Sequence, residues 1–194
     1  SRGYSAIILG EASTFLKLDD NRLLLNKKVT EVAYSDNGVV VYTEDGGCVS
    51  AAYAICTLSL GVLQNDVVKF SPKLPRWKET AIEKFSMGTY TKIFFQFNET
   101  FWPQDEQYFL YASPTARGYY AVWQSLSTEG FMPNSNIIFA TLTNDESYRV
   151  EQQTDEETKQ EALEVLRQMF PDKKIGEPTA FMYPRWTKMP WAYG

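Results

Sequence analysis

Histidine is absent from the 194-residue chain, and cysteine occurs only twice. Without histidine the chain has no Ser-His or Cys-His nucleophilic pair and lacks a usual zinc ligand, so no metal site is predicted. Cys48 and Cys56 lie on one stretch that we expect to be extended, and about 3.3 Å per residue would separate them by roughly 26 Å, too far for a disulfide. Any catalysis must therefore use another base or a cofactor.

The glycines do not form a phosphate-binding motif. None of the 11 falls in the G-x-G-x-x-G or P-loop spacing, which builds a tight turn at a helix N-terminus around a phosphate. Alone, the chain is not expected to hold a dinucleotide tightly.

The chain also lacks a basic tract and a long apolar run. Its net charge is −5, so the electrostatic signature of nucleic-acid binding is missing. No apolar run reaches the length of a membrane span, and the first residues show no signal-peptide pattern. We predict neither nucleic acid nor a membrane as partner, and we expect both ends of the chain to lie inside a longer protein.

Hydrophobic residues make up 44% of the chain and aromatic residues 15%, enough for a core and for an aromatic-lined cleft. In the first part, apolar spacing predicts a helix within residues 8–16. Strands are predicted at 29–34 and 39–43 around a turn at 36–38, with a third strand at 48–57. Two prolines near residue 70 suggest a boundary, and Trp77, Ala81 and Phe85 follow at helical spacing.

The second part is richer in strand signals. Residues 90–97 alternate, with Thr91, Ile93, Phe95 and Phe97 on one face, and further strands are predicted at 108–112, 119–124 and 137–142. A capping box at Thr154 and Glu157 opens a helix that Pro171 stops. The predicted fold class is α+β: a mixed, largely antiparallel sheet backed by helices, preceded by a smaller β-rich part.

Lys92 lies in the middle of the strand at 90–97, between Tyr90 and Phe94 on the face opposite the predicted core. It is either a solvent-facing lysine whose stem covers aromatic rings, or a partly buried lysine in an aromatic cavity that relays protons or orients a water. The pattern alone does not choose between these interpretations.

Residues 87–94, MGTYTKIF, resemble the strand of the flavin-containing amine oxidases that brings a lysine to the flavin. The resemblance extends over essentially the whole chain. Residues 117–124 and 150–155 are similar to plant polyamine oxidases in particular. The other matching stretches are 26–32 (NKKVTEV), 38–41 (GVVV), 57–64 (TLSLGVLQ), 117–124 (RGYYAVWQ) and 150–155 (VEQQTD).

The resemblance implies an FAD enzyme that oxidises spermine or spermidine at a C–N bond with O2 and releases hydrogen peroxide. It implies that Lys92 contacts the reactive flavin nitrogen through a water and that Tyr90 lines the substrate tunnel. Val29 would meet the adenine end of FAD through its backbone, and Trp186, in residues 183–186 (YPRW), would pack near the flavin. From the residues alone, Val29 and Trp186 are equally compatible with ordinary core positions.

On this resemblance, residues 1–70 form part of an FAD-binding domain and residues 71–194 a substrate-binding domain that is incomplete at its C-terminal end. Two alternatives stay open: a non-catalytic relative that binds polyamines or a partner protein, and an oxidase of another amine such as methylated lysine. Some plant relatives are extracellular, which together with the sequon at Asn98 gives a weak preference for that location.

Overall fold

The structure, a computed structural model, describes residues 3–194. The chain divides into two compact units, one up to Ser86 and one from Met87 to Gly194. This division lies later in the chain than the boundary expected near residue 70, because residues 71–86 still pack within the first unit. The assignment of the two parts to cofactor and substrate domains stays a prediction.

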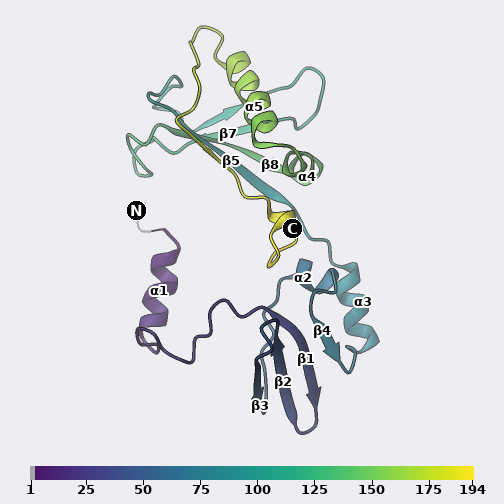
Figure 1. Cartoon of the computed structure of the whole chain (residues 1–194). Coiled ribbons are helices and arrows are strands. Elements are labelled where there is room, and N and C mark those ends of the chain that lie inside the picture. The colour runs from purple at the N-terminus through teal and green to yellow at the C-terminus, as the bar shows by residue number, and fades with distance from the viewer. Residues whose placement is uncertain (1–2) are drawn as a thin grey trace. The chain divides into compact units, whose positions relative to one another are not determined.

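The first unit is built on a four-stranded sheet of order β3-β2-β1-β4 (Figure 1). Its strands are β1 (Val29–Ser35), β2 (Gly38–Thr43), β3 (Cys48–Ala51) and β4 (Lys69–Ser71). Only the β1–β4 pair is parallel. The turn predicted at 36–38 is confirmed: Gly38 has φ 127°, and a Cβ there would lie 2.7 Å from the carbonyl oxygen of Ala51.

The third predicted strand is too long. It ends at Ala51 rather than at residue 57, because Ala51 pairs with Val39 near the start of β2 and no backbone partner lies beyond. Cys48 and Cys56 are both exposed and free.

Three helices complete the first unit: α1 (Ser5–Ser13), α2 (Leu60–Gln64) and α3 (Arg76–Lys84). The helix predicted from Ile8 to Leu16 is confirmed but ends at Ser13, and none of its residues is buried. The helix predicted after residue 76 is α3.

The second unit contains a five-stranded, fully antiparallel sheet of order β6-β7-β8-β5-β9. The strands are β5 (Tyr90–Gln96), β6 (Tyr108–Leu110), β7 (Val122–Ser125), β8 (Ile137–Thr143) and β9 (Ala180–Met182). The strand predicted at 119–124 begins only at Val122, because Tyr120 has φ 43°, a left-handed conformation that ordinary strands exclude. The sequence pattern did not predict β9.

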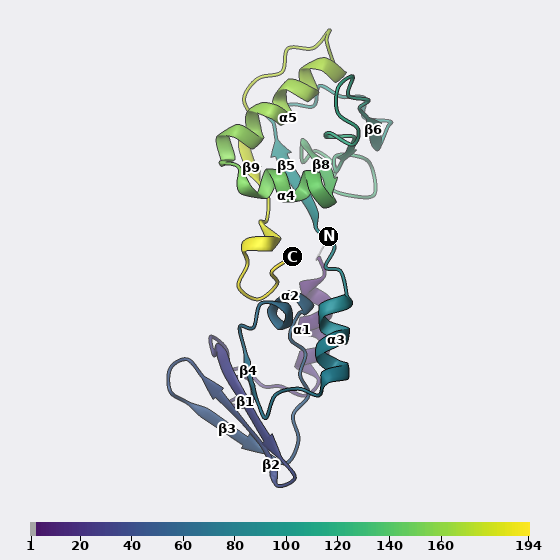
Figure 2. The same cartoon turned by 90° about the vertical axis from the view of Figure 1, so that its right-hand side faces the viewer.

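Two helices cover one face of this sheet, α4 (Asn144–Gln152) and α5 (Asp155–Met169) (Figure 2). The predicted capping box of α5 is confirmed, with both hydrogen bonds between Thr154 and Glu157 present. Helix α4 and the short 3₁₀ helix η1 (Trp186–Lys188) were not predicted.

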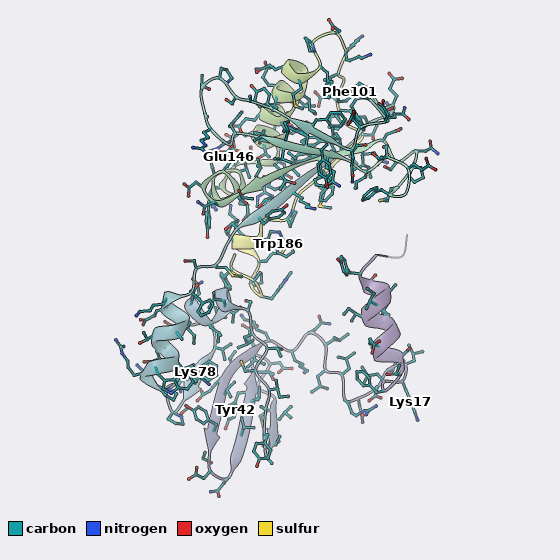
Figure 3. All side chains as sticks on the ribbon, turned by 180° about the vertical axis from the view of Figure 1, so that it is seen from behind. Lys17, Tyr42, Lys78, Phe101, Glu146 and Trp186 are labelled. Atoms are coloured by element: carbon teal, nitrogen blue, oxygen red, sulfur yellow. The ribbon has the colours of Figure 1, made fainter. Side chains whose placement is uncertain are left out.

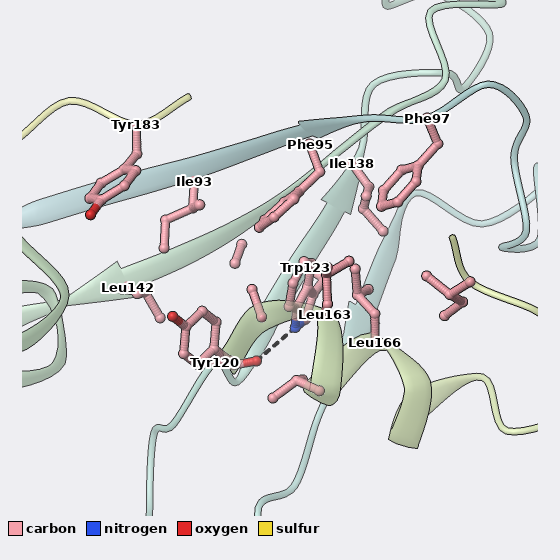
Figure 4. Close-up of a cluster of buried hydrophobic side chains, with 14 of the residues drawn as sticks. Ile93, Phe95, Phe97, Tyr120, Trp123, Ile138, Leu142, Leu163, Leu166 and Tyr183 are labelled. Atoms are coloured by element: carbon pink, nitrogen blue, oxygen red, sulfur yellow. Dashed lines mark hydrogen bonds between the residues drawn. The ribbon is translucent and has the colours of Figure 1, made fainter. Parts of the chain in front are cut away.

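The core lies between this sheet and its helices (Figure 4). The alternation predicted for β5 is confirmed, since Thr91, Ile93 and Phe95 are fully buried. Trp123 fills the centre, and its indole Nε1 donates a hydrogen bond of 2.8 Å to the Tyr120 carbonyl. Both α4 and α5 lie on the core side of the sheet.

No helix within residues 3–194 is both long enough and apolar enough to span a membrane. In the same part of the chain, no cluster of three or more cysteine or acidic side chains is arranged to hold a metal ion.

Candidate active site

The sheet of the second unit has an open face, which we define as the strand residues that point away from α4 and α5. Directly opposed residues of an antiparallel pair point to the same side, so the strand register identifies its members. They are Tyr90, Lys92, Phe94 and Gln96 of β5, Ile137, Phe139, Thr141 and Thr143 of β8, Val122 and Gln124 of β7, Tyr108 and Leu110 of β6, and Ala180 and Met182 of β9.

Lys92 is the only charged residue among these described positions, and it is half-buried. Its Nζ lies over the Phe139 ring, 4.6 Å from the centroid. Phe94 packs beside that ring, with centroids 5.0 Å apart and planes tilted by 39°. Within residues 3–194 no carboxylate lies within ion-pair distance of Lys92. An amine on an apolar aromatic surface therefore has its hydrogen-bonding capacity available to a ligand or a water.

Tyr90 shares this face with Lys92, two residues earlier on β5, and 54% of its surface is exposed. The structure thus brings two of the four predicted site residues together. Their shared face follows from the two-residue period of a strand.

Trp186 begins η1, and 37% of its surface is exposed (Figure 3). Both of its chain neighbours are anchored. Arg185 donates from Nη2 to the Asp155 carboxylate at 2.7 Å and to the Gln153 carbonyl at 3.0 Å. Thr187 donates from its backbone N–H and its hydroxyl to the carboxylate of Glu151, at 2.8 and 2.5 Å. Among the described residues, no ring or cation contact joins Trp186 directly to Lys92.

Val29 belongs to the first unit and is described only within it. It lies half-buried at the start of β1, at the edge of an irregularity between Val29 and Glu31. With Val32, Val39 and Val41 it lines a largely apolar hollow of about 710 Å³, which residues 52–58 also border.

Sequence reasoning missed Phe139 and Glu151. The alternation of residues 137–142 would have placed Phe139 on the face of Lys92 if the pairing of β8 with β5 had been known. Glu151 carries no such signal, since an acidic residue on a helix is usually solvated.

The sequence profile of the family described as flavin containing amine oxidoreductase matches residues 2–194. The chain therefore belongs to that family, whose cofactor is FAD. Among curated proteins it is similar to Polyamine oxidase 1 of Zea mays, at 47% identity over 194 residues, covering 95% of this chain and 38% of the relative.

Polyamine oxidase 7 of Oryza sativa subsp. japonica is 46% identical over 193 residues, covering 95% of this chain and 40% of the relative. A solved structure of putrescine oxidase, the wild type bound to putrescine, superposes with a TM-score of 0.73 at 20% identity, covering 97% of this chain and 39% of that one. This likeness confirms the α+β fold. The chain spans about two fifths of the length of these relatives.

The described residues fit FAD in part. The apolar hollow beside Val29 suits a planar ring system, and the aromatic open face around Lys92 suits a second one. The chain has no glycine motif to cradle a pyrophosphate.

Proposed function

We propose that the chain is part of an FAD-dependent polyamine oxidase that oxidises spermine or spermidine at a C–N bond with O2 and releases hydrogen peroxide. The observation that carries the proposal is the position of Lys92 as the single cation on the aromatic open face. Membership of the amine oxidoreductase family and the similarity to plant polyamine oxidases support it.

When bound, FAD would supply a two-electron acceptor for oxidation of the carbon next to an amine nitrogen, with O2 as the final oxidant. The residues of this chain would position the reactants. In this proposal Lys92 holds a water or a proton on the flavin side, since its Nζ has three donors and no ion-pair partner within residues 3–194.

The open face suits a polyamine chemically. Its methylene chain needs an apolar wall, which Tyr90, Phe94 and Phe139 offer, and its ammonium groups are attracted to aromatic faces. A positive charge on Lys92 would disfavour a second cation beside it, so the amine at the reacting carbon would be held in its neutral, oxidisable form. Tyr90 would form part of the tunnel wall.

Val29 and Trp186 are proposed as cofactor contacts. Val29 borders the apolar hollow of the first unit, and its side chain is free to pack there while its backbone meets a ligand. Trp186 offers a partly exposed ring beside two anchored neighbours.

The test is anaerobic reduction of the whole flavoprotein. Spermine or spermidine added without oxygen should bleach the visible flavin absorbance, and admitting oxygen should restore it with one hydrogen peroxide per turnover in a peroxidase-coupled assay. Putrescine and a methylated-lysine peptide serve as comparison substrates. Bleaching by the peptide but not by the polyamines, or by none of these amines, would overturn the substrate assignment.

A further inference from the structure

Glu151 is an acidic side chain buried completely in the second unit, with 0% of its surface exposed. Its Oε1 accepts a hydrogen bond of 2.5 Å from the Thr91 hydroxyl. Its Oε2 accepts the two hydrogen bonds from Thr187. Within residues 3–194 no lysine or arginine lies within ion-pair distance of it.

Such a group is expensive to bury. A carboxylate removed from water loses far more solvation than an amide or a hydroxyl, and only its hydrogen bonds compensate here. A leucine of similar size would fill the same space between α4 and β5 without that cost. The burial of Glu151 is therefore better explained by the two segments that its hydrogen bonds connect than by core packing.

The two segments that Glu151 joins are those of the candidate site. Thr91 immediately precedes Lys92 on β5, and Thr187 immediately follows Trp186 in η1. Thr91 is held in turn by Ser147 of α4, whose hydroxyl lies 2.5 Å from its own. One carboxylate on α4 thus joins the side chain of the residue before the lysine to the backbone and side chain of the residue after the tryptophan.

We propose that Glu151 is a positioning residue that holds the Trp186 segment in register with the strand of Lys92, and thereby shapes the surface that Trp186 offers to FAD. The cofactor part of this inference rests on the proposed function. The mechanical part rests only on the bridge from Thr91 through Glu151 to Thr187.

The first test compares Glu151→Leu with Glu151→Gln in the whole flavoprotein. Leucine removes both acceptor oxygens and with them all three hydrogen bonds. Glutamine can keep its oxygen toward the two Thr187 donors and turn its NH2 toward Thr91 Oγ1, which then donates to Ser147. The leucine variant should therefore release η1, and the glutamine variant should retain it.

Hydrogen exchange of the backbone amide at Thr187, followed on peptides covering residues 184–190, is the direct readout. Loss of its side-chain acceptor should speed this exchange about tenfold or more in Glu151→Leu. Glu161→Leu is the matched control, since Glu161 accepts hydrogen bonds from Arg149, Gln153 and Tyr120 but none from β5 or η1. It should leave exchange at Thr187 unchanged.

The second test uses milder variants. Thr187→Val removes one hydroxyl from the bridge, and Thr187→Ser restores it. The valine variant should shift the visible flavin band shape and speed FAD release, and the serine variant should return both to the wild-type values. A purely structural defect in Thr187→Val would lower the stability of the protein. It would not produce a change in flavin band shape and FAD release that Thr187→Ser reverses.

The outcomes separate this inference from the proposed function. Unchanged exchange at Thr187 in Glu151→Leu, or equal exchange in Glu151→Leu and Glu161→Leu, overturns the bridge. Normal flavin spectra in Thr187→Val overturn its link to the cofactor. Because none of these readouts needs an amine substrate, they decide the role of Glu151 even if polyamines fail to reduce the flavin.

Discussion

Replacing Lys92 by methionine should slow catalysis strongly while changing the stability of the protein only slightly. Methionine keeps much of the apolar stem that covers Phe139 and removes only the amine. The lost cation–π contact, at 4.6 Å from the ring centroid, is worth about 0.5–1 kcal/mol at a partly exposed site. The free energy of unfolding should therefore fall by no more than about 1 kcal/mol.

The rate of flavin reduction should fall much further. If Lys92 holds a water or a proton at the flavin, its loss should slow anaerobic reduction by spermine by about 10²–10⁴, the usual contribution of a positioned proton-transfer group. Rapid-mixing absorbance measures this step, and urea unfolding measures the stability.

The chain offers a matched control. Lys78 on α3 of the first unit lies with Nζ 5.2 Å from the centroid of the Trp77 ring, so Lys78→Met removes a similar contact from a lysine with no proposed catalytic role. It should leave the rate unchanged and lower the free energy of unfolding by no more than about 1 kcal/mol. Equal reduction rates for Lys92→Met and wild type, or a stability loss of several kcal/mol, would refute the proposed role of Lys92.

Three further results are expected. Thr154→Ala should cost about 1 kcal/mol in denaturant unfolding, because it removes the N-cap of α5. Burial works against ionisation of Glu161, yet hydrogen bonds from Arg149 and Gln153 hold the pKa of this carboxyl below its ordinary value. The resulting stabilisation should be complete above about pH 4.5 and disappear as the pH falls further, and Glu161→Gln should flatten this dependence. The purified 194-residue chain should show no flavin absorbance and no oxidase activity, because it lacks a glycine motif for the pyrophosphate.

Each of these results has a contrary outcome. An unchanged unfolding midpoint in Thr154→Ala would mean that the cap adds nothing to α5. An acid transition of the same steepness in Glu161→Gln would assign the pH dependence to other carboxyls. A visible flavin spectrum in the purified chain would show that the ring contacts suffice to hold the cofactor.

The sequence predicted those parts of the fold whose signals are local. The alternation from Tyr90 to Phe97 and the capping box at Thr154 each express a short-range rule, and both are confirmed. Strand β9 has only three residues, too few for an alternation to be recognised. The start of β7 depends on the left-handed backbone of Tyr120, and β-propensity cannot reveal that conformation.

In the candidate site, too, the sequence predicted what depends on local periodicity and not what depends on long-range contacts. Lys92 and Tyr90 share a face by strand periodicity, so their proximity could be predicted from the sequence. The ring beneath Lys92 comes from β8, and the pairing that brings Phe139 there is a long-range contact. The contacts of Glu151 could not be predicted for the same reason, since both of its partners lie far from it along the chain.

The position of β5 between β8 and β9 also matters while the protein is being made. One hydrogen-bonding edge of β5 is filled by β8, but the other stays open until residues 179–182 leave the ribosome. Between the synthesis of β8 and that of residues 179–182, the strand that bears Lys92 is therefore a sheet edge that could pair with another nascent chain. Pairing with β9 then covers the end of this edge from Phe94 to Gln96.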